Sequence, residues 1–284
     1  MIPKPQLSHA HVELTQEVEV VDELGRRSVI HIPIERDLTV YVDKRELVTL
    51  MTIGANPELL VLGYLKNQRL LSNITDIASV QVDWEVGSAA VVTHSGIDQL
   101  EQRTAKKIVT TGCGQGTVFG SLMDDIEQIR LPAEASVKQS VIVSIVDTIR
   151  RHPSIYKKAG SVHACALFSK TGELLQFVED VGRHNAVDAI AGKMWLENMQ
   201  GEDKIFYTTG RLTSEMVIKA AQMGIPILLS RSGTTAMGLQ LAQQLGMSLF
   251  SRCSGNHFLL LSQVERLHVD VAPQTASAQY PSPS

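Results

Sequence analysis

Short apolar runs alternate with amphipathic segments through the last third of the sequence, and this alternation limits the fold more than any other feature. Residues 205–207 precede a segment that ends at Gly224, and residues 225–229 precede a second one that ends at Gly246. A glycine just beyond the last apolar position is typical of a helix C-terminus. Strands that alternate with helices of this length predict a doubly wound, largely parallel sheet and therefore an α/β fold.

The first third of the chain predicts a smaller α+β unit. Pro57 stands where a helix begins, because proline is favoured in the first turn. Runs rich in β-branched residues predict strands at residues 17–21, 28–32, 38–42, 47–51, 77–82 and 89–93. We predict an α+β domain over residues 1–105, an α/β domain over residues 106–271 and a disordered tail over residues 272–284, which lacks apolar content.

A helix start is marked near the beginning of the second domain. Ser136, followed three residues later by Gln139, fits a capping box, in which the two side chains satisfy free N–H groups. Apolar residues then recur at helical spacing up to Ile149, and Pro153 follows. The pattern predicts a helix that has Ser136 as its N-cap and ends before Pro153.

The charge balance excludes several classes of function. The chain has 26 basic and 30 acidic residues, a formal charge of −4 and 5% aromatic residues. Nucleic-acid binding is disfavoured, since it needs basic faces or stacking aromatics. No apolar stretch approaches the roughly 20 residues that span a bilayer, and the N-terminus lacks the apolar core of a signal peptide. We expect a cytoplasmic protein that does not bind membranes.

Four loops after predicted strands each join a glycine to an arginine and small polar side chains. They cover residues 179–185, 208–214, 230–235 and 251–256. Loops at the carboxyl ends of parallel strands meet at one edge of the sheet, where ligands bind. Glycine lets a ligand approach the backbone, helix N-termini attract anions, and arginine matches phosphate in shape and charge.

One such loop is explained by ordinary helix caps and solvated arginines, but four together favour a phosphate-bearing ligand. The predicted contacts are Gly182, Arg183, His184, Asn185, Gly210, Arg211, Ser230, Arg231 and Ser232. No loop has the glycine spacing of a dinucleotide-binding fold or a P-loop, so neither class of enzyme is indicated.

The three cysteines are too few and too widely spaced for a disulfide framework or a zinc site. Cys113 has glycine on both sides, which predicts a mobile, exposed and nucleophilic thiol; a tight turn that the side chain merely fills is the alternative. Cys165 lies in an apolar run and is predicted to belong to the core. Cys253 lies in a ligand loop. The zinc deaminase signature is incomplete around His163, so we expect no metal site.

Several segments resemble the formate dehydrogenase accessory sulfurtransferase family, FdhD. The most specific is Glu-Asp-Val-Gly-Arg-His-Asn-Ala-Val-Asp at residues 179–188. Residues 160–167, 209–211 and 224–232 add to the resemblance, as do residues 47–51, which are predicted to form a hairpin with residues 38–42. The resemblance spans roughly residues 30–265.

This resemblance implies a sulfur carrier, a sulfurtransferase, with a cytidine-deaminase-like three-layer second domain that lacks zinc. Such a protein takes sulfur from a cysteine desulfurase as a persulfide, here on Cys113, and passes it to the molybdenum bis(molybdopterin guanine dinucleotide) cofactor before that cofactor enters formate dehydrogenase. It also implies a homodimer. The family's cofactor segment falls on Phe250, Ser251, Arg252, Cys253, Ser254 and Gly255. The phosphates of the cofactor suit the arginine and glycine loops.

The chain departs from the family at one position. Many members carry Cys-Gly-x-Cys, whereas this chain reads Cys113-Gly114-Gln115-Gly116. Gly116 takes the place of the second cysteine when Cys113 is aligned with the first, but Cys113 can also be aligned with the second; in both alignments the loop has one cysteine. Sulfur release therefore needs an outside reductant, another cysteine or direct attack by the metal centre. The missing cysteine supports the alternative of a cofactor-binding chaperone without sulfur chemistry. A third alternative is a hydrolase that uses Cys113 with His163 or His184.

Overall fold

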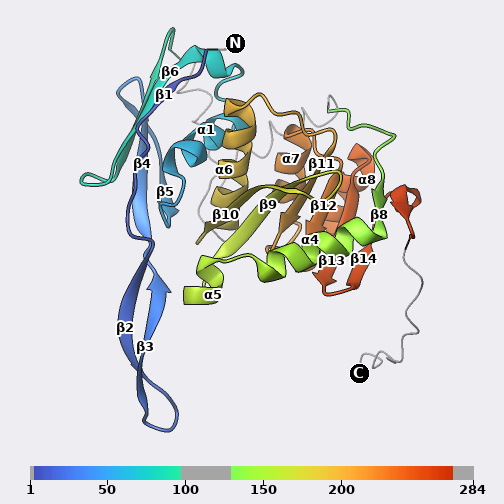
Figure 1. Cartoon of the computed structure of the whole chain (residues 1–284). Coiled ribbons are helices and arrows are strands. Elements are labelled where there is room, and N and C mark those ends of the chain that lie inside the picture. The colour runs from blue at the N-terminus through green and yellow to red at the C-terminus, as the bar shows by residue number, and fades with distance from the viewer. Residues whose placement is uncertain (1–2, 97–128, 271–284) are drawn as a thin grey trace.

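The computed structural model describes residues 3–96 and 129–270, and in this part of the chain a six-stranded sheet forms the centre of the molecule (Figure 1). Its strands lie in the order β10-β9-β11-β12-β13-β14. Their bounds are β9 His163–Ser169, β10 Leu174–Asp180, β11 Lys204–Thr208, β12 Ile227–Ser230, β13 Ser248–Ser254 and β14 His257–Leu260.

The predicted α/β class is confirmed, but the expectation of a largely parallel sheet is wrong. Within the described part of this central sheet, only β11, β12 and β13 pair in parallel, while β9 runs antiparallel to both of its neighbours and β14 antiparallel to β13. The reason is that β9–β10 and β13–β14 are hairpins. Gly172 and Gly255 take positive φ angles in their turns, and a tight turn can join only antiparallel strands.

Helices cover both faces of this sheet and make three layers. On one face lie α4 (Gln139–Arg151) and α5 (Ile155–Ala159). On the other lie α6 (Arg183–Leu196), α7 (Ser214–Gln222) and α8 (Ala236–Leu245). The side chains of β9 alternate between the two cores, because successive residues of a strand point to opposite faces.

The predicted capping box is not the start of α4. Lys138 is the N-cap residue, and residues 137–138 form the short strand β8 (Val137–Lys138), which pairs with β15 (Leu267–His268). The backbone N–H and the hydroxyl of Ser140 both donate to the Asp270 carboxylate, at 2.9 and 2.6 Å. A carboxylate from a distant part of the chain therefore accepts a hydrogen bond from a free backbone N–H group in the first turn of α4. The predicted end before Pro153 is confirmed.

The N-terminal part forms a second sheet in the order β1-β6-β7-β4-β5. The predicted strands and the helix starting at Pro57 are present, with bounds β1 Gln6–Leu7, β4 Arg36–Val42, β5 Arg45–Thr52, α1 Pro57–Asn67, β6 Ile77–Asp83 and β7 Ser88–Thr93. Two 3-10 turns, Ile74–Asp76 and Val264–Arg266, complete the described elements, together with the ribbon of β2 (Thr15–Val21) and β3 (Arg27–Pro33).

Helix α1 lies directly against α6, and this contact joins the two sheets through one continuous apolar core. The helices meet at Gly63 and Gly192, so closely that a Cβ atom on Gly63 would lie 1.6 Å from the backbone oxygen of Asp188. The division at residue 105 lies outside the described residues, as does the tail, so both stay predictions. Among the described helices, none combines the length and apolar character needed to cross a membrane.

Candidate functional site

Four strands end at one edge of the central sheet. β10 and β11 are both antiparallel to β9 and therefore run in the same direction, which β12 and β13 share. The amino end of β9 reaches this edge too, with His163 opposite Asp180. The predicted convergence of the four arginine and glycine loops is thus confirmed by the strand directions.

Backbone hydrogen bonds join neighbouring loops into one frame. The N–H of Arg231 donates to the oxygen of Thr208 at 3.0 Å, and that of Arg252 donates to the oxygen of Ser232 at 2.8 Å. The hydroxyl of Ser230 donates to the oxygen of Gly210 at 2.6 Å. These bonds satisfy polar groups within the frame and hold the exposed arginines on an ordered backbone.

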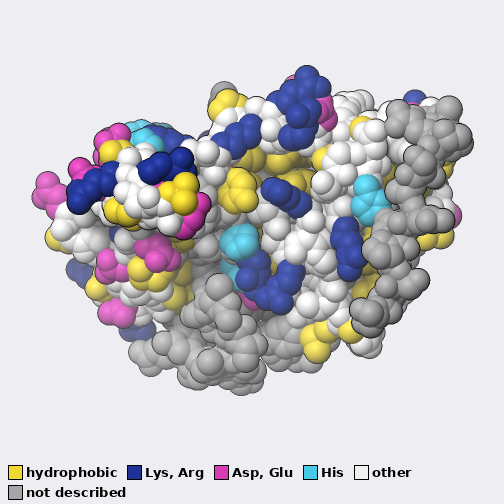
Figure 2. Space-filling view, turned by 90° about the horizontal axis from the view of Figure 1, so that it is seen from below, with side chains coloured by type: hydrophobic (Ala, Val, Ile, Leu, Met, Phe, Trp, Pro, Cys, Tyr) yellow, Lys and Arg dark blue, Asp and Glu magenta, His cyan; other side chains and the backbone are white. Residues whose placement is uncertain are grey.

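A cavity of about 600 Å³ opens beside this frame, on the face of the sheet that carries α4 and α5. Arg150, Lys157 and Arg231 line it with positive charge, and Figure 2 shows Lys and Arg side chains over the middle of the molecule in the view from below. Glu179 also lines it, but its carboxylate accepts the backbone N–H groups of Ile155 and Tyr156, at 2.6 and 3.1 Å. The described wall therefore suits an anionic ligand.

The structure separates the predicted contacts into two groups. Those that line the cavity are Arg231, Ser232, Cys253, Ser254 and Gly255. Phe250, Ser230 and Ser251 are buried in the sheet, while Arg211 and Arg252 are exposed and do not line the cavity. Gly182, Arg183, His184, Asn185 and Gly210 do not line this cavity, since α6 begins on the opposite face. Their assignment as ligand contacts stays a prediction.

Asn185 and Asp180 hold the start of α6 against the N-terminal sheet. The Asn185 side-chain amide donates to the oxygen of Met51 at 2.6 Å and to Asp180 at 2.8 Å. Asp180 also accepts the Thr52 hydroxyl at 2.5 Å. Burial raises the pKa of Asp180, and these hydrogen bonds counteract that rise. Sequence reasoning missed this anchoring role, because both partners on β5 are more than 100 residues away.

His184 belongs to a buried charged cluster behind the site. Its Nε2 lies 3.3 Å from the Glu215 carboxylate, and Lys219 pairs with Asp188 at 2.9 Å and lies 3.7 Å from Glu215. Burial, followed by the positive charges of Lys219 and Arg183, lowers the pKa of His184 to about 2. The imidazole is therefore neutral. Its Nδ1 has no hydrogen-bond partner among the described residues, which leaves an acceptor free.

The low pKa of His184 predicts a loss of stability in acid. The unfolded chain binds a proton near pH 6.5, whereas the folded chain does so only near pH 2, so stability falls as the pH drops below 6.5. When the pH is lowered from 7.5 to 5, His184 alone should reduce the free energy of unfolding by about 2 kcal/mol. Urea unfolding of the wild type and of His184→Gln at both pH values measures it. An equal loss in both proteins would contradict the assignment.

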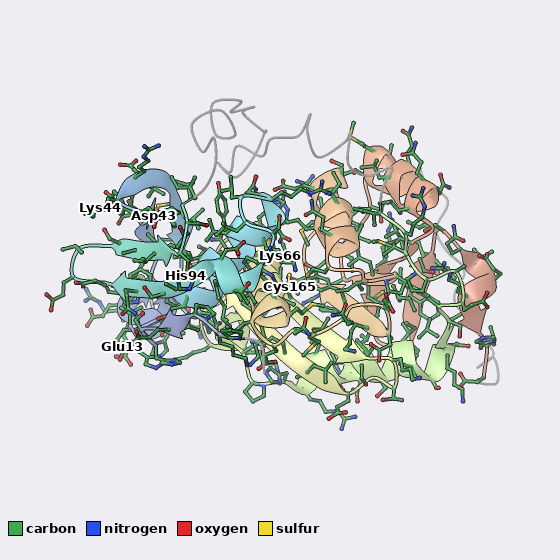
Figure 3. The ribbon with its side chains drawn as sticks, turned by 90° about the horizontal axis from the view of Figure 1, so that it is seen from above. Glu13, Asp43, Lys44, Lys66, His94 and Cys165 are labelled. Carbon is green, nitrogen blue, oxygen red and sulfur yellow. The ribbon has the colours of Figure 1, made fainter. Side chains whose placement is uncertain are left out.

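Neither described cysteine has the character of a sulfur nucleophile. Burial raises the pKa of both Cys165 and Cys253 to about 12. Cys165 lies in the interior between the sheet and the helices (Figure 3), as predicted, and its sulfur is 3.4 Å from the Thr208 hydroxyl. Cys253 reaches the cavity wall but is 1% exposed. Cys113 and the glycines around it lie outside the described residues.

Sequence reasoning missed the wall supplied by α4 and α5. Arg150, Tyr156 and Lys157 come from this helical pair rather than from the loops after strands. The Arg231 guanidinium lies over the Tyr156 ring, 6.0 Å from its centre, and so links the two sides of the cavity. The signal in the sequence is two basic pairs, residues 150–151 and 157–158, around a proline. Among the described residues, no cluster of His, Cys, Asp and Glu could hold a metal ion.

The sequence profile of the FdhD/NarQ family matches residues 33–268 of the chain. The sulfur carrier protein FdhD of Sulfurisphaera tokodaii is 31% identical over 231 residues, which are 81% of this chain and 87% of that relative. The sulfur carrier protein FdhD of Geobacillus kaustophilus is 28% identical over 236 residues, 83% and 89% of the two chains. A crystal structure described as a formate dehydrogenase accessory protein from Desulfotalea psychrophila matches with a TM-score of 0.71 and 25% identity, over 89% of this chain and 98% of that one.

Proposed function

Because the chain belongs to the FdhD/NarQ family, we propose that it is a sulfur carrier that serves the maturation of a formate dehydrogenase. The relatives named as sulfur carriers support the first part, and the formate dehydrogenase accessory protein supports the second. The observation that carries the proposal to this chain is the electropositive cavity at the sheet edge, which offers a place for the phosphorylated acceptor of the sulfur.

The sulfur carrier itself is Cys113 in this proposal. Its thiolate attacks the terminal sulfur of a persulfide on a cysteine desulfurase; a new S–S bond forms on Cys113, and the desulfurase thiolate leaves. The two buried thiols are unsuited to this step, because a pKa near 12 leaves almost no thiolate at neutral pH. Delivery of the sulfur as sulfide takes up two electrons, which an external thiol reductant supplies.

The acceptor in this proposal is the molybdenum bis(molybdopterin guanine dinucleotide) cofactor, handled as a substrate. Arg150, Lys157 and Arg231 would bind its phosphate oxygens, and Tyr156 offers a ring face to a planar base. Ser254 and Gly255, from the segment predicted by resemblance, border the same space. We propose further that the protein works as a homodimer and that the transfer takes place in the cytoplasm.

Guanosine diphosphate tests the anion site directly. It should raise the thermal unfolding temperature of the chain, because a ligand that binds only the folded state stabilises it. Arg231→Ala should reduce this rise, since it removes a charge-assisted contact worth about 1.5–3 kcal/mol. Arg45→Ala, at an exposed arginine at the start of β5, is the control. If guanosine diphosphate raised the unfolding temperature of Arg231→Ala as much as that of the wild type, Arg231 would not belong to the phosphate site.

The sulfur-carrier proposal is tested by incubating the protein with a cysteine desulfurase and cysteine, followed by intact-mass analysis. We expect a gain of one sulfur atom that a thiol reductant removes. The alternative of a chaperone without sulfur chemistry is supported by the absence of a second cysteine near Cys113 in the sequence. A protein that binds guanosine diphosphate but gains no sulfur would establish that alternative instead.

A further inference from the structure

The ribbon of β2 and β3 exposes apolar side chains on both of its faces. Val18 lies opposite Ile30 on one face, and Glu19 lies opposite Val29 on the other. Ile30 is 44% exposed, Val29 59% and Val21, at the end of β2, 63%. A two-stranded ribbon alone is at best marginally stable in water. Its apolar side chains therefore need a cover.

The chain's own described elements leave most of the ribbon uncovered. Its main packing contact with the rest of the described molecule is between β3 and α5. From there the two strands lead away from the central sheet, and the tip lies far from the body (Figure 1). The described elements of the same chain therefore offer no cover for the distal half, and a surface on another molecule can supply one.

The charges of the ribbon identify the kind of surface that fits. Residues 13–27 contain five acidic and two basic residues, a net charge of −3. Residues 148–160, at the end of α4 and through α5, contain four basic residues and no acidic one. Asp147 pairs with Arg150 and Arg151 but leaves this strip positive. Tyr156, 51% exposed, adds an apolar contact beside Lys157 and Lys158.

We propose that the ribbon docks on the α4–α5 strip of a second copy of this chain, and that the two copies exchange ribbons about a two-fold axis. In such an exchange the same two surfaces meet twice, so the contact forms a closed dimer to which no third copy can add. Because β3 already lies beside α5, the exchange brings both ribbons and both α5 helices together around the axis. Tyr156 and Lys157 line the cavity, so each ribbon reaches the mouth of the other copy's site.

This inference gives the proposed homodimer its contact surface and rests on that part of the proposed function. Light scattering coupled to size-exclusion chromatography should show a dimer at micromolar concentration. Added salt should weaken the dimer, since screening reduces attraction between exposed charges. Ile30→Asp should weaken it further, and Val86→Asp, at an exposed valine between β6 and β7, is the matched control. A monomeric wild type would overturn the proposal.

A charge exchange tests the contact even if Ile30→Asp disturbs the ribbon. The double variant Glu17→Lys with Glu19→Lys reverses the charge of the ribbon. The double variant Arg151→Glu with Lys158→Glu reverses the charge of the strip and changes no residue that lines the cavity. Each double variant alone should dimerise at least about tenfold more weakly, because like charges then face each other. A mixture of the two should form mixed dimers of nearly wild-type affinity, since opposite charges meet at both contacts.

The outcomes separate this inference from the proposed function. Variants that load sulfur from a desulfurase but run as monomers support the ribbon contact. The inference would be overturned by double variants that dimerise like the wild type, or by a mixture of the two double variants that forms no mixed dimers. If the double variants stay dimeric yet no longer activate formate dehydrogenase, the ribbon contacts the client enzyme instead, and the proposal is again overturned. Loss of sulfur loading with intact dimers would count against the proposed function alone.

Discussion

Replacing Cys113 by serine should abolish sulfur transfer completely, the largest functional effect expected of a single substitution in this chain. A serine hydroxyl does not ionise near neutral pH and forms no persulfide, so the first step has no acceptor. Formate dehydrogenase produced in cells that contain only Cys113→Ser should have the activity of cells that lack the chain. Guanosine diphosphate should still stabilise the variant, because the described cavity lies on other residues.

The other two cysteines are the controls for this substitution. Cys165→Ser should lower stability, because it places a hydroxyl in a site that is 0% exposed, but should leave sulfur loading intact. Cys253→Ser should also load sulfur, since burial holds the pKa of the native thiol near 12. If cells with Cys113→Ser still produced an active formate dehydrogenase, Cys113 would not be the carrier, and the chaperone alternative would replace it.

The sequence was sufficient to predict elements whose stabilising contacts are local. The helices that end at Gly224 and Gly246 were predicted because a left-handed residue follows the last apolar position. The position of the arginine loops at one edge of the sheet was also predicted, because strands that alternate with helices run in the same direction and end at the same edge. The antiparallel β13–β14 end of the sheet was not predicted, because Gly255 and Asn256, which are typical of a two-residue hairpin turn, were interpreted as part of a ligand loop.

The parts that could not be predicted depend on distant partners. Asp270 stabilises the first turn of α4 across 130 residues, and the local capping box at Ser136 is not used. The cavity wall formed by α4 and α5 could not be predicted, because its position depends on the hydrogen bond between the N–H of Ile155 in α5 and the distant Glu179 carboxylate. The hydrogen bond from the Asn185 side chain to β5 could not be predicted either, because its partner Met51 is distant in the sequence. A pattern of residues shows which chemistry is available, whereas the direction of each side chain depends on packing.

The contact between α1 and α6 leads to the second large prediction. Gly63 lies inside a helix, where intrinsic propensity favours alanine by about 1 kcal/mol, so the sequence alone predicts that Gly63→Ala stabilises the chain. The structure predicts the opposite. The new Cβ would lie 1.6 Å from the Asp188 oxygen and 2.8 Å from the Gly192 nitrogen. Both are backbone atoms, so no side chain can rotate away and the helices must move apart.

Urea unfolding measures this effect, and its sign decides between the two predictions. Overpacking of a core typically costs 1–3 kcal/mol, and a backbone collision places Gly63→Ala at about 3 kcal/mol or more. That is a large share of the 5–15 kcal/mol that stabilises a typical domain. Gly192→Ala should behave alike, since its Cβ would lie 2.0 Å from the Leu59 oxygen, whereas Gly233→Ala meets nothing within 4 Å and should change stability by under about 0.5 kcal/mol. A stabilised Gly63→Ala would mean that the two helices do not cross at these glycines, and that the two sheets are joined in another way.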